Sequence, residues 1–305
     1  MATSDAELDD VLDRIPVLHG VPRTVAELSG GLTNQNVHVT TPSGDYVVRR
    51  LLGDTDLLGI DRDAEHANTL AAAEACVGAP VVDYLPELGV LVIGYLEGRT
   101  CTNDDLARPE VLERTAVALK RLHAVPRFTG DFDMFTRQAG YLRALGARGC
   151  RLWKGYADHE EAFRRTRAAL SVRAGPTVPC HNDLLAGNVV DDGGRAWLID
   201  YEYSGNNDPC FDLGNTSTEC DLDLDQTAAL LTAYDGSLRR GRLARVRLQA
   251  LVSAYGWALW GALQASASTL DFDFDGWGRE RFEKAARGFT ADGFRDLLDE
   301  ATRAD

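Results

Sequence analysis

Basic residues are scarce relative to acidic ones in this chain of 305 residues. Lysine and arginine number 32 against 47 aspartates and glutamates, which gives a formal net charge of −15 at pH 7. A field of this sign repels a phosphate backbone, so we expect no nucleic-acid partner. It attracts small cations, although acidity of this size is also ordinary for a protein surface that only confers solubility.

The chain also lacks the marks of an exported or membrane protein. Its six cysteines are dispersed with no Cys-x-x-Cys pair, and a chain of this length needs no disulfides, so reduced thiols in a cytoplasm are expected. The first residues have neither the basic start nor the apolar core of a signal peptide. The uncharged stretch 248–270 contains glutamine, serine and threonine, which predicts a buried helix and no membrane partner.

Hydrophobic periodicity divides the chain into a strand-rich and a helix-rich part. In the first part we predict strands at 24–29, 35–41, 46–51, 81–84 and 90–95, with a helix at 61–76. In the second part we predict helices at about 103–125, 141–145, 156–170, 225–234, 243–263 and 279–301, interrupted by strands and loops over 178–215. The pattern predicts an α+β fold with a β-rich lobe at 1–97, a larger α-helical lobe at 98–305 and a cleft between them.

The most informative segment is a polar loop between two apolar, strand-like runs. It contains His181, Asp183 and Asn188, and Asp200 follows the second run. Taken alone, Asp183 and Asn188 are better explained as turn formers and Asp200 as a strand end. Together they suit phosphoryl transfer, because one carboxylate can accept a hydroxyl proton while an amide oxygen and a second carboxylate supply hard ligands for Mg²⁺.

This ordered set resembles the protein-kinase-like small-molecule phosphotransferases, which include choline and ethanolamine kinases and aminoglycoside phosphotransferases. The resemblance implies a bilobal protein-kinase-like fold with ATP and Mg²⁺ as cofactors. It also implies that Asp183 is the catalytic base and that Asn188 and Asp200 bind the metal. His181 and Asp212 are then structural residues that support the catalytic loop.

A glycine-containing turn between two predicted strands supplies the first candidate nucleotide contacts. Gly30 and Gly31 allow backbone N–H groups to approach phosphate oxygens, because no Cβ stands in the way. Thr33 and Asn34 follow directly. Taken alone, this pattern is better explained by a plain turn, so the assignment depends on the resemblance.

The next strand and helix offer a cation and a partner for it. The family places a phosphate-binding cation where this chain has Arg49, with Arg50 as the alternative if the strand register differs by one residue. Glu65 on the following helix is expected to pair with that cation, although a surface ion pair would give the same pattern. Tyr95 and Leu96 resemble the hinge that hydrogen-bonds adenine through its backbone.

Two tryptophans late in the chain point to the acceptor substrate. Trp257 and Trp260 are three residues apart and share one face of a helix, where they could equally be core residues. A trimethylammonium group donates no hydrogen bond and is bound by an aromatic cage, for which choline is the standard example. In the choline-kinase branch such a pair forms the cage. The resemblance therefore assigns Trp257, Trp260, Tyr203, Glu219 and Gln264 to the substrate site.

The predicted activity is ATP- and Mg²⁺-dependent phosphorylation of choline or a related amino alcohol such as ethanolamine, giving phosphocholine from choline. An aminoglycoside or another cationic hydroxylated acceptor is the alternative among enzymes. An inactive nucleotide-binding protein on the same fold is the alternative outside enzymes. Leu185 and Leu224 depart from the polar residue and the tyrosine expected in choline kinases, so the pocket could suit a different amino alcohol.

Overall fold

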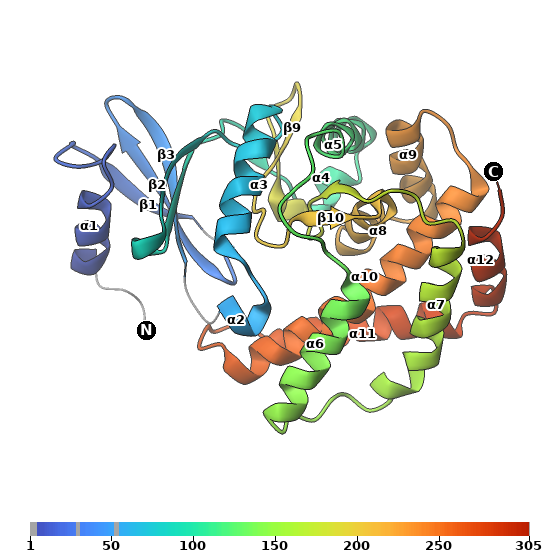
Figure 1. Cartoon of the computed structure of the whole chain (residues 1–305). Coiled ribbons are helices and arrows are strands. Elements are labelled where there is room, and N and C mark those ends of the chain that lie inside the picture. The colour runs from blue at the N-terminus through green and yellow to red at the C-terminus, as the bar shows by residue number, and fades with distance from the viewer. Residues whose placement is uncertain (1–4, 29–30, 52–54, 305) are drawn as a thin grey trace.

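The computed structural model describes residues 5–28, 31–51 and 55–304. At one end of the molecule, five antiparallel strands form a sheet in the order β1-β2-β3-β5-β4 (Figure 1). The elements of this first part are α1 (Asp5–Asp13), β1 (Thr24–Leu28), β2 (Asn34–Thr41), β3 (Gly44–Leu51), α2 (Thr55–Leu58), α3 (Arg62–Glu74), β4 (Val81–Leu85) and β5 (Val90–Gly94).

Alternation of side chains fixes which face of this sheet is buried. Val37, Val39 and Val48 point to the same side and pack against Leu12 and Ile15, which lie in and just after α1. On β3, neighbouring residues point to opposite faces, so the register decides which of two consecutive arginines faces the rest of the molecule.

The second part is mainly helical. Its elements are β6 (Arg99–Thr100), α4 (Asn103–Leu106), α5 (Pro109–Leu122), α6 (Met134–Ala147), α7 (Glu160–Val172), β7 (Val178–Cys180), β8 (Val189–Asp191), β9 (Ala196–Leu198), β10 (Gly205–Asn207), α8 (Pro209–Glu219), α9 (Leu224–Asp235), α10 (Arg240–Ala267), α11 (Phe274–Thr290) and α12 (Phe294–Ala301). The long helix α10 crosses this part and packs against α6, α8, α11 and α12 (Figure 1).

The predicted α+β class, with a small sheet-rich part and a larger helical part, is confirmed. The stretch 248–270 lies mostly in the buried helix α10, as expected, and among the described residues no helix is long and apolar enough to cross a membrane. The six cysteines are free thiols. The division at residue 97 stays a prediction.

Several predicted boundaries were wrong for identifiable reasons. The expected helix 103–125 is two helices, because Pro109 starts a new one. The expected helix 279–301 is also two, since the chain leaves helical geometry at Ala291 and restarts after Gly293. Helix α8 was missed inside the stretch assigned to strands and loops. Polar residues of α8 are buried on every side of the helix, so its sequence shows no regular spacing of apolar residues.

Candidate active site

A cavity of about 290 Å³ lies where the sheet-rich part meets the helical part. The first part contributes Gly31, Leu32 and Thr33, and all other lining residues come from the helical part. Four carboxylates line the cavity: Asp183, Asp200, Glu202 and Glu219. The cavity therefore gathers several of the acidic and aromatic residues singled out in the sequence.

The hairpin of β8 and β9 brings the two predicted metal ligands to the same end. Asn188 directly precedes β8, and Asp200 follows β9 after one intervening residue. Val189 pairs with Leu198 in the antiparallel ladder, and the Ile199 N–H donates to the Asn188 carbonyl at 3.0 Å. Asp200 adopts a left-handed backbone conformation with φ of 71°, which is uncommon for a residue with a Cβ and typical of functional turns.

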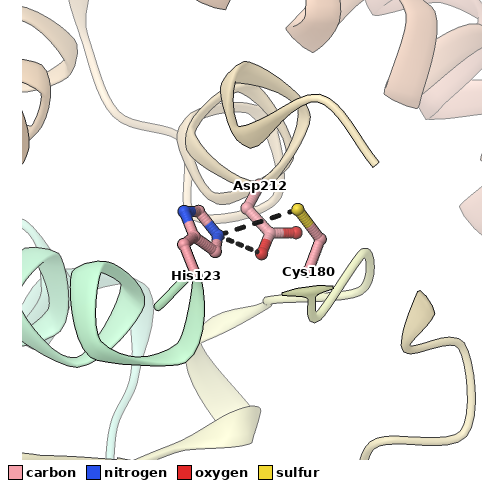
Figure 2. Close-up of side chains that lie close together, drawn as sticks. All are labelled: His123, Cys180 and Asp212. Atoms are coloured by element: carbon pink, nitrogen blue, oxygen red, sulfur yellow. Dashed lines mark hydrogen bonds and ion pairs between the residues drawn. The ribbon is translucent and has the colours of Figure 1, made fainter. Parts of the chain in front are cut away.

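Asp212 supports the loop that contains Asp183. Its carboxylate accepts hydrogen bonds from the backbone N–H groups of His181 at 2.8 Å and Asn182 at 2.7 Å, and from His123 Nε2 at 3.0 Å (Figure 2). Burial alone would raise the pKa of Asp212, but these donors hold it below its usual value. The His181 ring in turn donates from Nε2 to the Ile199 carbonyl at 2.8 Å, which ties the loop to the hairpin. Both residues thus contact the loop directly, and their supporting role stays a prediction.

Cys180 completes a buried cluster with His123 and Asp212, shown in Figure 2, whose ligand-type atoms lie within 4.8 Å of one another. The atoms of this cluster are already used within the protein: the Cys180 thiol donates to the Asn207 carbonyl at 3.6 Å, and the Asp212 carboxylate accepts the hydrogen bonds described above. The second ring nitrogen of His123 is hydrogen-bonded to the Tyr234 hydroxyl at 2.7 Å. We therefore assign this cluster to support of the loop.

Asp183 is the acidic residue of the loop best placed to contact an acceptor. Its side chain is half-buried at the cavity wall, and its pKa is raised well above the usual value by burial and by the nearby charges of Glu219, Asp200 and Glu202. Asn188 donates from Nδ2 to the Asp183 carbonyl at 2.9 Å, which leaves its Oδ1 available to a ligand. Amide and carboxylate oxygens in one acidic cavity are a donor set that fits Mg²⁺.

Arg49 reaches across from β3 to this cavity's acidic wall. Its Nη2 lies 2.7 Å from Asp200, 3.4 Å from Glu65 and 3.8 Å from Glu202. Burial alone would lower the pKa of Arg49, but these three carboxylates raise it. Arg50 points to the opposite side of the sheet and pairs with Glu7 at 2.9 Å. The register therefore places Arg49, and not Arg50, next to the candidate metal ligand.

Glu202 is a site residue that the sequence reasoning did not select. It accepts hydrogen bonds from Thr33 Oγ1 and Asn34 Nδ2, each at 3.0 Å, and lies 3.3 Å from Arg62. Burial and the charge of Asp200 raise the pKa of Glu202 to about 7. Thr33 and Asn34 are therefore turned toward a buried carboxylate, an arrangement that fixes the turn carrying Gly31 against the helical part.

The remaining predicted nucleotide contacts lie in different places. Gly31 lines the cavity, and a Cβ at this position would clash with the Asn34 carbonyl oxygen, so the turn requires glycine. Gly30 lies outside the described residues. Tyr95 and Leu96 follow β5 and do not line the cavity. The Tyr95 N–H already donates to the Asp45 carbonyl at 3.0 Å, so that backbone donor is used within the sheet.

Four aromatic side chains form one wall of the cavity: Tyr203, Trp257, Trp260 and Trp277. Tyr203 meets Trp257 edge to face with ring centres 4.8 Å apart, and its hydroxyl accepts a hydrogen bond from Trp260 Nε1 at 2.8 Å. Trp260 contacts Trp277 at 5.1 Å between ring centres. The wall combines the predicted pair on α10 with one ring from the loop after β9 and one from α11.

Glu219 lies at the end of α8 beside this wall and is held by an arginine that the sequence reasoning missed. Arg281 contacts both carboxylate oxygens of Glu219, with Nε 3.1 Å from Oε1 and Nη2 bonded to Oε2. The guanidinium also lies over the Trp277 ring at 3.3 Å from its centre. Gln264 was predicted in this site, but it is buried on α10 and is not among the lining residues.

A better helix boundary would have revealed Trp277 and Arg281. Asp273 caps α11 by accepting from the Gly276 N–H at 2.9 Å, so the helix begins five residues earlier than the predicted start at 279. With that start, Trp277 and Arg281 are one turn apart on the same face. Of the two departures noted in the sequence, Leu185 lines the cavity, whereas Leu224 is exposed at the start of α9.

Comparison with known proteins agrees with this geometry. Residues 24–248 match the model of a family described as "Phosphotransferase enzyme family". Ethanolamine kinase 1 of Homo sapiens is 26% identical over 308 residues, which cover 86% of this chain and 66% of that protein. The chain thus spans slightly less than two thirds of the length of this relative.

Solved structures are similar over nearly the whole chain. A choline/ethanolamine kinase family protein from Mesorhizobium loti superimposes with a TM-score of 0.87 and 30% identity, covering 97% of this chain and 98% of that one. Choline kinase LicA from Streptococcus pneumoniae superimposes with a TM-score of 0.78 and 24% identity, covering 92% and 98%. LicA has also been solved in complex with AMP, and that structure gives a TM-score of 0.71 at 22% identity, covering 95% and 98%.

These matches confirm the bilobal, protein-kinase-like fold expected from the sequence. The likeness to LicA, below one quarter identity, shows the fold alone. The family match and the relative at 30% identity together go further. The chain belongs to the phosphotransferase enzyme family and, within it, to the choline/ethanolamine kinase family.

Proposed function

We propose that this phosphotransferase uses ATP and Mg²⁺ to phosphorylate the hydroxyl group of choline, giving phosphocholine and ADP. The observation that carries the proposal is the composition of one cavity. The aromatic wall of Tyr203, Trp257, Trp260 and Trp277 faces the same space as Asp183 and the candidate metal ligands. An aromatic wall suits a quaternary ammonium group, and a carboxylate beside it suits activation of the hydroxyl at the other end of choline.

In the proposed reaction, Asp183 accepts the proton of the choline hydroxyl while the hydroxyl oxygen attacks the γ-phosphorus of ATP. The bond to the oxygen bridging the β- and γ-phosphorus atoms breaks, and ADP leaves with the bond electrons. Asn188 Oδ1 and the Asp200 carboxylate would hold Mg²⁺, which when bound offsets the charge of the phosphate oxygens. Arg49 would contact the phosphates, and the turn containing Gly31 would approach them through its backbone.

Nucleotide binding would add to the charges around Arg49, whose Nε is buried without a hydrogen-bond partner among the described residues. In the structure this side chain forms its shortest ion pair with Asp200, at 2.7 Å. A nucleotide phosphate would join the three carboxylates that already surround Arg49, and Asp200, as a candidate metal ligand, would face a second cation. The Arg49–Asp200 pair would therefore weaken as each partner gains a further opposite charge.

The hydrogen-bond acceptors near the aromatic wall favour choline over ethanolamine. Both oxygens of Glu219 already accept from Arg281, and the Tyr203 hydroxyl accepts from Trp260. A primary ammonium group brings three N–H donors that require such acceptors, whereas a trimethylammonium group brings none. Leu185 adds apolar surface to the same cavity.

The size of the cavity bears on the alternative acceptors. About 290 Å³ lies at the small end of the range for ligand pockets, roughly 300 to 1,000 Å³. A small amino alcohol therefore fits better than a multi-ring aminoglycoside. A coupled assay of ADP release tests this directly, with choline, ethanolamine and a panel of aminoglycosides as acceptors at equal ionic strength.

We expect the highest kcat/KM with choline and dependence of turnover on Mg²⁺. A clear preference for ethanolamine would keep the reaction and correct the acceptor. Preference for an aminoglycoside would overturn the acceptor assignment. Nucleotide binding without turnover on any alcohol would instead indicate an inactive relative.

A further inference from the structure

Arg281 occupies a position that no other part of the reaction scheme explains. It projects from α11 into the wall of the active-site cavity and joins two other elements there. Its guanidinium contacts both oxygens of Glu219 at the end of α8 and covers one face of Trp277. In addition, its Nη1 donates to the Trp277 carbonyl at 3.3 Å. These contacts fix the guanidinium in one orientation.

We propose that Arg281 determines which ammonium group the enzyme accepts, because it occupies hydrogen-bond acceptor positions of Glu219 that a primary ammonium group would need. This inference rests on the proposed function. The Glu219 side chain is only 3% exposed and that of Arg281 is 17% exposed. A buried carboxylate facing a cation site would otherwise accept hydrogen bonds from a primary ammonium group. With Arg281 in place, one acceptor position on each oxygen of Glu219 is taken and the negative charge is offset, so less of its hydrogen-bonding capacity is open to a substrate.

The charge balance of the cavity supports the same assignment. Among the described residues that line the cavity, Arg281 is the only basic one, and four carboxylates line the same cavity. Arg281 therefore reduces the attraction of the cavity for compact or multiply charged cations, while the aromatic wall retains affinity for a dispersed trimethylammonium charge.

The test is the ratio of kcat/KM for choline to kcat/KM for ethanolamine, measured by ADP release. This ratio does not depend on the fraction of folded enzyme, which matters because removing one partner of a buried ion pair destabilises the fold. Arg281→Met removes all five N–H donors but keeps an unbranched chain over Trp277. Arg281→Lys keeps the charge and loses the paired, two-oxygen contact.

We expect Arg281→Met to lower the choline-to-ethanolamine ratio at least about tenfold, because one charge-assisted hydrogen bond to ethanolamine becomes available. Arg281→Lys should give an intermediate ratio. Glu219→Gln alone should change the ratio little, since Glu219 is already engaged, whereas Glu219→Gln added to Arg281→Met should restore the preference for choline. This non-additivity is specific to the proposed mechanism.

A matched control lies on the same helix. Arg279 is exposed and pairs with Asp275 at 2.9 Å, so Arg279→Met removes one positive charge from α11 without touching the cavity. Its ratio should equal that of the unmodified enzyme. An unchanged ratio in Arg281→Met, or equal changes in Arg281→Met and Arg279→Met, would overturn the inference. Absence of activity on both alcohols in the unmodified enzyme would instead contradict the proposed function.

Discussion

Trp260 offers a quantitative test of whether the aromatic wall recognises a positive charge. Its indole hydrogen-bonds to the Tyr203 hydroxyl and packs against Phe274 and Trp277, with ring centres 5.8 Å and 5.1 Å away. Trp260→Leu removes the aromatic face and leaves an apolar side chain of smaller volume. The substitution therefore has two separate costs, one for packing and one for the lost contact with a cation.

The packing cost comes from the burial of this side chain, which is 5% exposed. Large-to-small substitutions of buried aromatic residues destabilise proteins by about 3 to 5 kcal/mol, and leucine retains part of the lost volume, so we expect about 2 to 3 kcal/mol here. The loss of a cation–π contact in a desolvated pocket is about 1 to 2 kcal/mol. This second cost corresponds to a roughly 5- to 30-fold decrease in kcat/KM for choline.

A neutral substrate separates the two costs. The dimethylbutanol isomer in which a tert-butyl group replaces the trimethylammonium group has the shape of choline and carries no charge; it is called dimethylbutanol below. Kinetics of ADP release should show that Trp260→Leu lowers kcat/KM for choline about 5- to 30-fold more than for dimethylbutanol. Trp260→Phe keeps an aromatic face and should show a smaller difference. An equal decrease in kcat/KM for both alcohols in Trp260→Leu would refute the assignment of a cation site and indicate that Trp260 only contributes to packing.

Four further predictions concern the charged residues at and around the cavity. Asp183→Asn should abolish turnover and leave nucleotide affinity within about threefold by calorimetry, and retained turnover would remove Asp183 from its role. Because the pKa of Asp183 is raised, the folded state keeps its proton to a higher pH than the unfolded chain does. The free energy of unfolding therefore falls as the pH rises above about 4, the usual pKa of an aspartate. Thermal unfolding of Asp183→Asn should show a smaller fall with pH and a higher Tm at pH 7. Asp212→Asn should lower the free energy of unfolding by about 3 to 5 kcal/mol in urea titrations, because the buried carboxylate loses its charge-assisted hydrogen bonds. A decrease below about 1 kcal/mol would contradict the supporting role of Asp212. Arg49→Gln should raise the KM for ATP at least about tenfold, whereas Arg50→Gln should leave it within about twofold; equal effects of the two substitutions would contradict the strand register as the basis of phosphate contact.

Local sequence signals were sufficient for much of the fold and for one half of the site. The two strand-like runs around the loop were predicted and pair as the β8–β9 hairpin that brings Asn188 and Asp200 together, because this pattern depends on neighbouring residues only. The pair Trp257 and Trp260 could be placed on one face because helical spacing is regular. Their resemblance to a family pattern then related these local features to a function.

The rest depended on contacts between distant segments. Glu202 meets Thr33 from more than one hundred and sixty positions away, and no periodicity in either segment indicates that contact. Helix α8 contains polar residues that are buried because they hydrogen-bond across the core, as Asn215 does with the Leu184 N–H at 2.6 Å. A pattern based on hydrophobicity assigns such residues to the surface, so α8 was missed.

The central claim is that one cavity joins a cation site to a phosphoryl-transfer site, and identification of the product tests it most directly. Phosphorus NMR of a reaction containing the protein, ATP, Mg²⁺ and choline should show phosphocholine and ADP appearing in equal amounts. The same reaction with Asp183→Asn should show neither compound above the uncatalysed background. Phosphocholine formation that persists in Asp183→Asn, or ADP released by the unmodified enzyme without phosphocholine, would contradict the account.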